Sequence, residues 1–273
     1  VLTETPCVYS LQEARQVVET AARTGRRYML AENYIWMGWA MAFKQLIEEG
    51  KLGEIVYAEG DYTHDCRDLM FYDDGERVPY SELDKHPDAT PAWRATDLPP
   101  LLYCSHTLGP MLHLMGDRIV SAFGFGVEDK GMPGRVPTDL ESALFQTETG
   151  ATIRLTNGFA LAHPFSMYYS LVGTRGSAKL FLAGDLSAKY YSDLDQDSSG
   201  WQDLDLTWGD RPDGRSNVDA MVDDYIQAIV TDGPIPKDIH ASMDMQLPGI
   251  VAHESAMAGG VKMDVPDSRA WDQ

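Results

Sequence analysis

The segment YCSHTLGP, residues 103–110, carries residue types that are suited to acid/base chemistry. Tyr103 and His106 lie three residues apart at the start of an apolar run, and a helix would place both on one side. A histidine takes or gives a proton near neutral pH, and a neighbouring tyrosine can pass that proton on or bind a substrate hydroxyl. The alternative is a buried pair of side chains that satisfy each other and cap the helix.

A second Tyr/His pair favours the chemical interpretation. Tyr62 and His64 are two residues apart within residues 55–65, which read as a strand. Alternate residues of a strand lie on the same face. Two such pairs in one chain predict a pocket lined by proton-transfer groups, with Tyr62, His64, Tyr103 and His106 as the candidates.

The first fifty residues predict an alternation of strands and helices. Ser10 and Glu13 form a capping box, which opens a helix that continues to residue 24 and ends at Gly25. A short apolar strand (27–32), a connecting loop (33–37) and a second helix (39–49) follow. This order is typical of the parallel βα layout of a doubly wound sheet.

The remainder of the chain has a different character. A long strand (55–65) precedes an acidic loop (about 73–100) that carries Trp93 and Arg94, and a loop of this length is usually functional or mobile. Short strands divided by turns then predict an antiparallel meander. These strands are expected at about 119–127, 141–148, 151–159, 166–173, 178–182 and 186–192, with helices at 217–231 and 239–257 and a last strand at 261–265.

Composition narrows the class of protein. The formal net charge of −20 argues against nucleic-acid binding, because a protein must neutralise phosphates to bind them. No apolar run approaches membrane-spanning length and no leader opens the sequence, so we expect a cytoplasmic protein with no membrane partner. The three cysteines are far apart, which predicts neither a disulfide framework nor a zinc site. Asp65 and Asp68 lack a second ligand cluster, so no metal site is expected.

Several segments resemble the Gfo/Idh/MocA superfamily of NAD(P)-dependent oxidoreductases. They are the ETP turn (4–6), KLGEIVYAEG (51–60), SHTLGPMLHLMGDRI (105–119), LVGTRGSAKL (171–180) and HESAMAGG (253–260). The resemblance implies a C-terminal remnant of a Rossmann-like NAD(P)-binding domain at 1–53. It also implies a substrate and oligomerisation domain at 54–273, an open, mostly antiparallel sheet with flanking helices. The glycine-rich turn of a dinucleotide site is not among these residues, so we expect the sequence to begin within that domain.

Two departures from the family pattern narrow the subgroup. Thr5 stands where the family turn carries a catalytic lysine, and Leu102 stands where the helix motif carries an aspartate. The NAD-dependent glycosidases, typified by α-N-acetylgalactosaminidase, resemble this chain at these places. Their ordered motifs correspond here to Glu32-Asn33, residues 62–65, Trp93-Arg94 and residues 103–110.

The resemblance implies roles for further residues. Glu32 would bind sugar hydroxyls, and the alternative is a surface carboxylate that caps the next turn. Asn33, together with Glu4 and Thr5 of the turn, would contact the cofactor. Arg94 would reach the dinucleotide or the substrate with Trp93 as its packing platform, and the alternative is an ordinary ion pair of a loop.

Two hypotheses of function follow. The first is an NAD-dependent oxidoreductase, NADP not being excluded, that moves a hydride at a sugar CH–OH, C3 in the glycosidase scheme. It either releases a keto-sugar and NADH or completes a redox-neutral glycosidase cycle, and His106 is the predicted base in both. The second is a non-catalytic binding or oligomerisation module. The resemblance also implies a homodimer or higher oligomer formed through the open sheet.

Overall fold

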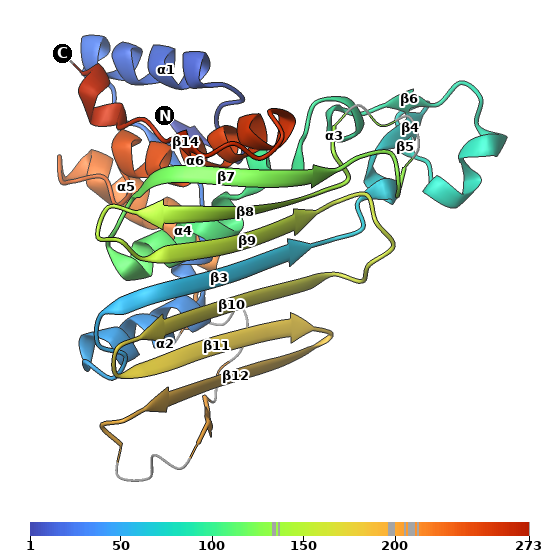
Figure 1. The fold of residues 1–273 in the computed structure, drawn as a ribbon. Helices are drawn as coiled ribbons and strands as arrows, with labels where there is room; N and C mark the ends of the chain where they lie inside the picture. The colour runs from blue at the N-terminus through green and yellow to red at the C-terminus, as the bar shows by residue number, and fades with distance from the viewer. Residues whose placement is uncertain are drawn as a thin grey trace.

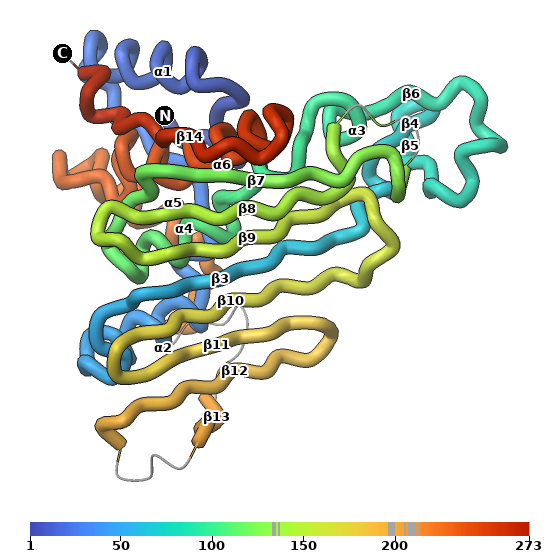
Figure 2. Tube along the Cα trace, in the orientation of Figure 1, coloured from blue at the N-terminus to red at the C-terminus, as the bar shows by residue number. Residues whose placement is uncertain are grey.

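A large mixed sheet organises the computed structural model of this chain, which describes residues 1–132, 135, 137–195, 200–204, 206, 211 and 213–272. Nine strands are hydrogen-bonded in the order β13-β12-β11-β10-β3-β9-β8-β7-β14 (Figure 1). Helices α4 (Ser105–Met115) and α6 (Ile239–Met257) pack against one face of this sheet. The tube in Figure 2 shows the long central strands running side by side from β7 to β12.

The N-terminal region has the predicted alternation of strand and helix. Strands β1 (Leu2–Thr3) and β2 (Met29–Leu30) pair in parallel, and α1 (Leu11–Thr24) connects them. The Ser10 side chain accepts a hydrogen bond from the Glu13 backbone N–H at 3.2 Å, which confirms the predicted N-cap. The connection expected at 33–37 is instead a 3₁₀ turn, η1 (Asn33–Trp36), before α2 (Gly38–Glu48).

The region expected as a long loop folds into small elements of its own. Its three-stranded sheet comprises β4 (Phe71–Asp73), β5 (Glu76–Arg77) and β6 (Thr90–Pro91). The short helix α3 (Trp93–Thr96) and the 3₁₀ turn η4 (Pro100–Tyr103) then return the chain to the start of α4. Strands this short carry too little pattern to be predicted from alternation.

The expected antiparallel meander is interrupted by one long strand, which corrects the prediction. β3 (Ile55–Thr63) inserts between β9 (Thr152–Gly158) and β10 (Ser166–Gly173), antiparallel to β10 but parallel to β9. A parallel pair needs a long crossover, and the chain between β3 and β9 supplies one. The other strands are β7 (Ile119–Val127), β8 (Leu140–Thr147), β11 (Gly176–Ala183), β12 (Asp185–Ser192), β13 (Gln202–Asp203) and β14 (Met263–Asp264).

One hydrophobic core connects the two predicted domains. The same cluster of buried side chains contains Val18 of α1, Phe43 of α2 and Leu155 of β9. Trp39 of α2 stacks on Tyr169 of β10 with ring centroids 4.3 Å apart. Helix α6 contributes Leu247 and Val251 to this core, whereas Met221 of α5 (Asn217–Val230) belongs to a second buried cluster beside β2. The boundary between residues 53 and 54 therefore stays a prediction.

Among the described residues, no helix is both long enough and apolar enough to cross a bilayer.

Candidate active site

A buried carboxylate holds the imidazole of His106. The Nδ1 atom of His106 lies 2.9 Å from Glu32 Oε1 and 3.0 Å from Oε2, and Glu32 is 0% exposed. Oε1 also accepts a hydrogen bond from the Tyr34 backbone N–H at 3.1 Å. Nδ1 therefore donates to the carboxylate, and Nε2 is the ring nitrogen that can take a proton. Among the described residues, Nε2 has no hydrogen-bond partner.

Three tyrosine rings surround the same imidazole. Tyr34 stacks on His106 with ring centroids 4.3 Å apart and planes 4° from parallel. Tyr103 and Tyr62 approach it edge-on, with centroid separations of 4.9 Å and 6.0 Å. The aromatic rings fix the plane of the imidazole, while Glu32 fixes its rotation.

Two features of the helices and strands position Glu32 and His106. The Tyr169 hydroxyl of β10 donates to the backbone carbonyl of His106 at 2.5 Å, which connects the sheet to the first turn of α4. A Cβ atom at Gly109 would lie 2.9 Å from Glu32 Cγ, so glycine at this position lets the carboxylate approach the helix. Tyr168 faces the opposite side of the sheet, as alternation requires. Tyr169, and not Tyr168, therefore lies on the side of the sheet that carries His106.

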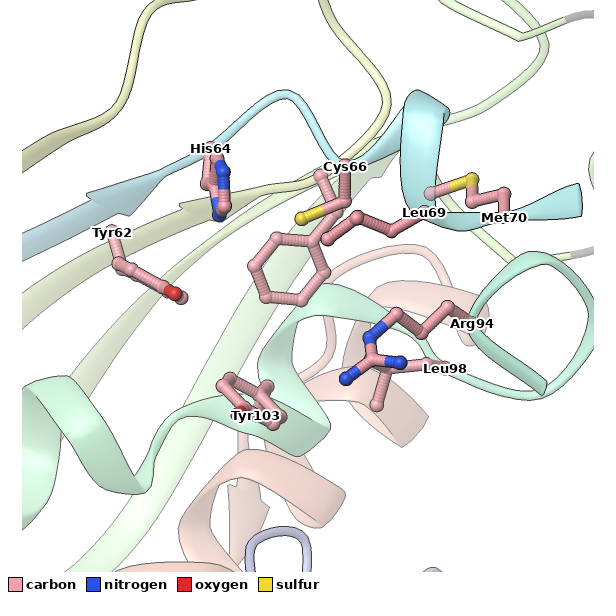
Figure 3. A pocket seen from close by; sticks show the side chains of 9 residues that line it. Tyr62, His64, Cys66, Leu69, Met70, Arg94, Leu98 and Tyr103 are labelled. Atoms are coloured by element: carbon pink, nitrogen blue, oxygen red, sulfur yellow. The ribbon is translucent and has the colours of Figure 1, made fainter. Parts of the chain in front are cut away.

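A cavity of about 210 Å³ opens beside the tyrosines (Figure 3). The side chains that line it are Tyr62, His64, Cys66, Leu69, Met70, Arg94, Leu98, Tyr103 and Phe159. Four of the predicted site residues, Tyr62, His64, Arg94 and Tyr103, thus line the same cavity. His106 does not line this cavity and instead packs behind two residues that do.

Burial sets the protonation states of these groups. It lowers the pKa of His64, although Asp65 opposes that shift, so His64 is neutral at pH 7 and can accept a proton. Burial and the nearby Glu32 carboxylate raise the pKa of Tyr103, and burial and Tyr34 raise that of Tyr62. Both phenols stay protonated at neutral pH and act as hydrogen-bond donors.

Arg94 brings a positive charge to the cavity. Its guanidinium lies 4.5 Å from the ring centroid of Trp93, as the predicted packing platform requires. No carboxylate lies within ion-pair distance of it in the described part of the chain, so the expected alternative of a loop ion pair is not what the structure contains. In Figure 3 the guanidinium points toward Tyr103, where an anionic or hydroxyl-bearing ligand would meet it.

The ETP turn reaches the start of α4. The Thr5 hydroxyl lies 2.6 Å from the Ser105 hydroxyl, one residue before His106. Glu4 is exposed, and its charge adds to the effects of burial and Glu32 that raise the pKa of Tyr103. Asn33 follows Glu32 in η1, and its carbonyl accepts a hydrogen bond from Asn217 at 3.4 Å. These three predicted contacts of the cofactor therefore gather around the Glu32–His106 pair.

Sequence reasoning missed some parts of the site. Tyr34 stacks on His106, yet its only signal in the sequence was an aromatic residue two positions after Glu32. Cys66 and Phe159 line the cavity, and burial raises the pKa of the Cys66 thiol to about 11, so it is not a nucleophile at neutral pH. Asp65, considered above for a metal, pairs with Arg67 at 2.7 Å.

Comparison with known proteins identifies the family. The model of the GFO/IDH/MocA C-terminal domain matches residues 40–179, just over half of the chain. A glycosyl hydrolase family 109 protein from Streptomyces filamentosus is 28% identical over 295 residues, covering 97% of this chain and 57% of its own. An α-N-acetylgalactosaminidase from Tannerella forsythia is 23% identical over 302 residues, covering 97% of this chain and 64% of its own.

Solved structures show the same fold. An inositol dehydrogenase homologue from Azotobacter vinelandii, complexed with NADH and myo-inositol, superposes with a TM-score of 0.67 at 17% identity. The match covers 97% of this chain and 71% of that one. The chain spans 57% of the length of the Streptomyces relative. On the family match and the shared fold, the chain belongs to the GFO/IDH/MocA family.

Proposed function

We propose that this chain forms the substrate site of an NAD-dependent enzyme that acts on a sugar or glycoside. The observation that carries the proposal is the His106 imidazole, held by the buried Glu32 carboxylate next to two phenols of a small cavity. The glycosyl hydrolase relatives and the inositol dehydrogenase homologue support this class of substrate.

His106 is the proposed base for the sugar C3 hydroxyl. Glu32 keeps the proton on Nδ1 and stabilises the positive charge that develops when Nε2 takes the substrate proton. Tyr103 and Tyr62, being protonated, donate hydrogen bonds that hold the substrate hydroxyls or relay the proton. An exposed fraction of only 9% for His106 favours transfer within a closed site.

His64 is the proposed second proton acceptor. It lies on the cavity wall beside Tyr62, with the two ring centroids 6.3 Å apart. A ketone at C3 acidifies the C2 proton, and a neutral imidazole can remove it while the bond from C1 to the aglycone breaks. To complete a redox-neutral hydrolysis, water gives its hydroxyl to C1 and a proton to the aglycone oxygen, and His64 returns the proton to C2. The C3 ketone would then regain its hydride from the reduced cofactor and its hydroxyl proton from His106.

The residues around the Glu32–His106 pair fit a dinucleotide. Arg94 has an unpaired guanidinium toward the cavity within the described part of the chain, which suits a phosphate or a substrate hydroxyl. Asn33, Glu4 and Thr5 would surround the nicotinamide end. Bound NAD+ would accept a hydride from the sugar carbon, and the balancing hydroxyl proton goes to His106.

Absorbance at 340 nm tests the proposal in the full-length protein. With p-nitrophenyl α-N-acetylgalactosaminide and catalytic NAD+, nitrophenol release without net NADH supports the redox-neutral cycle. A steady rise at 340 nm with free sugars and NAD+ supports simple dehydrogenation. Neither signal over a panel of sugars and glycosides, from folded protein that binds NAD+, would leave the binding or oligomerisation module as the explanation.

We also propose that the open face of the sheet forms a homo-oligomer contact. That face carries Phe125 and Phe181, which are 58% and 48% exposed. Exposed aromatic rings on an uncovered sheet are typical of protein interfaces. Light scattering after size exclusion tests this proposal, and replacing Phe181 with Asp should shift a dimer toward the monomer. A wild-type protein that elutes as a monomer at all concentrations contradicts it.

A further inference from the structure

Two cavities at the far end of α4 share His113 and Lys237. The larger cavity is about 490 Å³ and the smaller about 240 Å³. His113 lies near the end of α4, and Lys237 lies two residues before α6. Lys237 Nζ is 2.6 Å from His113 Nδ1. None of the catalytic roles proposed above uses this pair.

Lys237 is a half-buried cation that has no acidic partner in the part of the chain that the structure describes. No carboxylate lies within 4.0 Å of its Nζ among the described residues. The adjacent carboxylate, Asp238, is engaged as the N-cap of α6, where it accepts the Ala241 backbone N–H at 2.9 Å. The ammonium group has three N–H donors and gives one to His113, so two remain for a ligand.

His113 adds another donor. Burial, together with Lys237 and Lys44, lowers the pKa of His113 to about 4, so the ring is neutral at pH 7. Nδ1 accepts from the ammonium, which leaves the ring proton on Nε2. The pair therefore presents N–H donors and a positive charge, and it offers no acceptor.

The other charged groups of the two cavities are already engaged. In the larger cavity, Asp244 binds Arg269 at 2.7 Å and Glu148 binds Arg118 at 3.0 Å. Asp267 and Asp117 in that cavity are likewise bound, to Arg269 and to the Arg118 backbone N–H.

The smaller cavity contributes further cations. Lys44 and Arg211 line it, and its carboxylate, Asp224, accepts the Trp36 indole N–H at 2.7 Å. Lys44 and Arg211 are themselves paired with Glu48 and Asp213, whereas Lys237 has no such partner in the described chain.

We propose that Lys237 and His113 form a binding site for a phosphate group, free or carried by a small molecule. A phosphate is an acceptor with several oxygens and a negative charge, which matches the remaining N–H donors and the positive charge of the ammonium. The larger cavity has room for the rest of a sugar phosphate. Since His113 follows His106 by seven residues on α4, this site lies two turns from the candidate active site.

Calorimetric titration of the full-length protein tests the proposal in phosphate-free buffer at constant ionic strength. The probes are inorganic phosphate and glucose 6-phosphate, with glucose and chloride as controls. We expect saturable binding, and Lys237→Met should weaken it at least about tenfold because a charge-assisted hydrogen bond is lost. Lys179→Met is the matched control, since Lys179 lies over the Trp201 ring on the sheet. The affinity of the Lys179→Met variant for phosphate should equal that of wild type.

The relative affinities distinguish a free phosphate from a carried one. Tighter binding of glucose 6-phosphate than of inorganic phosphate indicates a carried phosphate, and equal binding indicates a free one. No saturable binding by wild type, or unchanged binding in Lys237→Met, overturns the proposal. If Lys237→Met does not fold, the rate of chemical acetylation of Lys237 in the wild-type protein is measured instead by mass spectrometry. Saturating ligand should slow this acetylation severalfold. An unaltered rate overturns the proposal. Neither readout depends on catalytic activity.

Discussion

Two histidines on one helix have opposite partners. His106, in the first turn of α4, donates to the carboxylate of Glu32, which is entirely buried. His113, two turns later, accepts from the ammonium of Lys237. A carboxylate favours the charged imidazolium, whereas an ammonium disfavours it. The same residue type is therefore arranged as a proton acceptor at one end of the helix and as a neutral ligand-binding group at the other.

This difference shows that the partner decides the role of a histidine here. Both rings lie on α4, and burial disfavours the charge on His113. Of the two, His106 is the one whose ring nitrogen faces a carboxylate and whose neighbours are the phenols of a cavity. The predictions below test this contrast, and the largest expected effect comes first.

Removing each histidine in turn is the most direct test. His106→Ala should lower turnover about 10²- to 10⁴-fold, which is the usual contribution of general-base catalysis. His113→Ala, the same change on the same helix, should keep turnover within about fivefold of wild type, because His113 takes no part in the proposed reaction. Steady-state kinetics of the full-length enzyme measure both. Activity of His106→Ala within a few-fold of wild type would show that this imidazole is a helix cap.

Replacing Glu32 distinguishes a role in orienting His106 from a role in binding the substrate. Glu32→Gln keeps the shape of the side chain and removes the charge that stabilises the imidazolium, so kcat should fall roughly 10- to 100-fold. If the carboxylate acts through His106, KM should stay within about threefold. A large rise in KM with kcat preserved would instead support the predicted role of Glu32 in binding sugar hydroxyls. Circular dichroism controls for folding, since this position is buried.

Removing the phenol of Tyr103 should have a smaller effect. Burial keeps this phenol protonated, so Tyr103→Phe loses one hydrogen bond to the substrate or to the relay. Such a bond contributes about 0.5–1.5 kcal/mol, which corresponds to a loss of kcat/KM of roughly 2- to 12-fold. Tyr168→Phe, on the opposite face of the sheet, is the control and should leave kcat/KM unchanged. A loss as large as that of His106→Ala would make Tyr103 the base.

His113, at the other end of α4, should affect the stability of the protein rather than its turnover. Because the pKa of His113 is lowered to about 4 in the folded state, the unfolded chain binds more protons than the folded one between about pH 4 and 6.5. The contribution of neutral His113 to the free energy of unfolding is therefore fully present above pH 6.5 and is lost as the pH falls toward 4.

Replacing His113 with Gln should flatten that dependence. Urea unfolding at pH 7 and pH 4.5 should show a difference in unfolding free energy that is smaller in His113→Gln by on the order of 1 kcal/mol, after allowance for partial exposure. His163→Gln is the control, since His163 is exposed. Equal differences in wild type and His113→Gln would contradict the neutral His113 on which the contrast rests.

Local patterns in the sequence determined much of the framework. The capping box at Ser10, the spacing that brings Tyr62 of β3 and His64 just after this strand to one cavity, and the turn glycines all act over a few residues. The fold class and the family followed from such segments and from their order along the chain. The meeting of Tyr62 and His64 with Arg94 and Tyr103 in one cavity, by contrast, depends on how β3, α3 and η4 pack.

Tertiary structure decided what distant residues do to one another. Glu32 is 74 positions from His106, and Lys237 is 124 from His113, so no periodicity connects either pair. The place of β3 between β9 and β10 likewise depends on how whole strands pack, since alternation fixes the faces of a strand but not its neighbours. The two histidines of α4 acquire different chemistry because packing brings a carboxylate to one and an ammonium to the other.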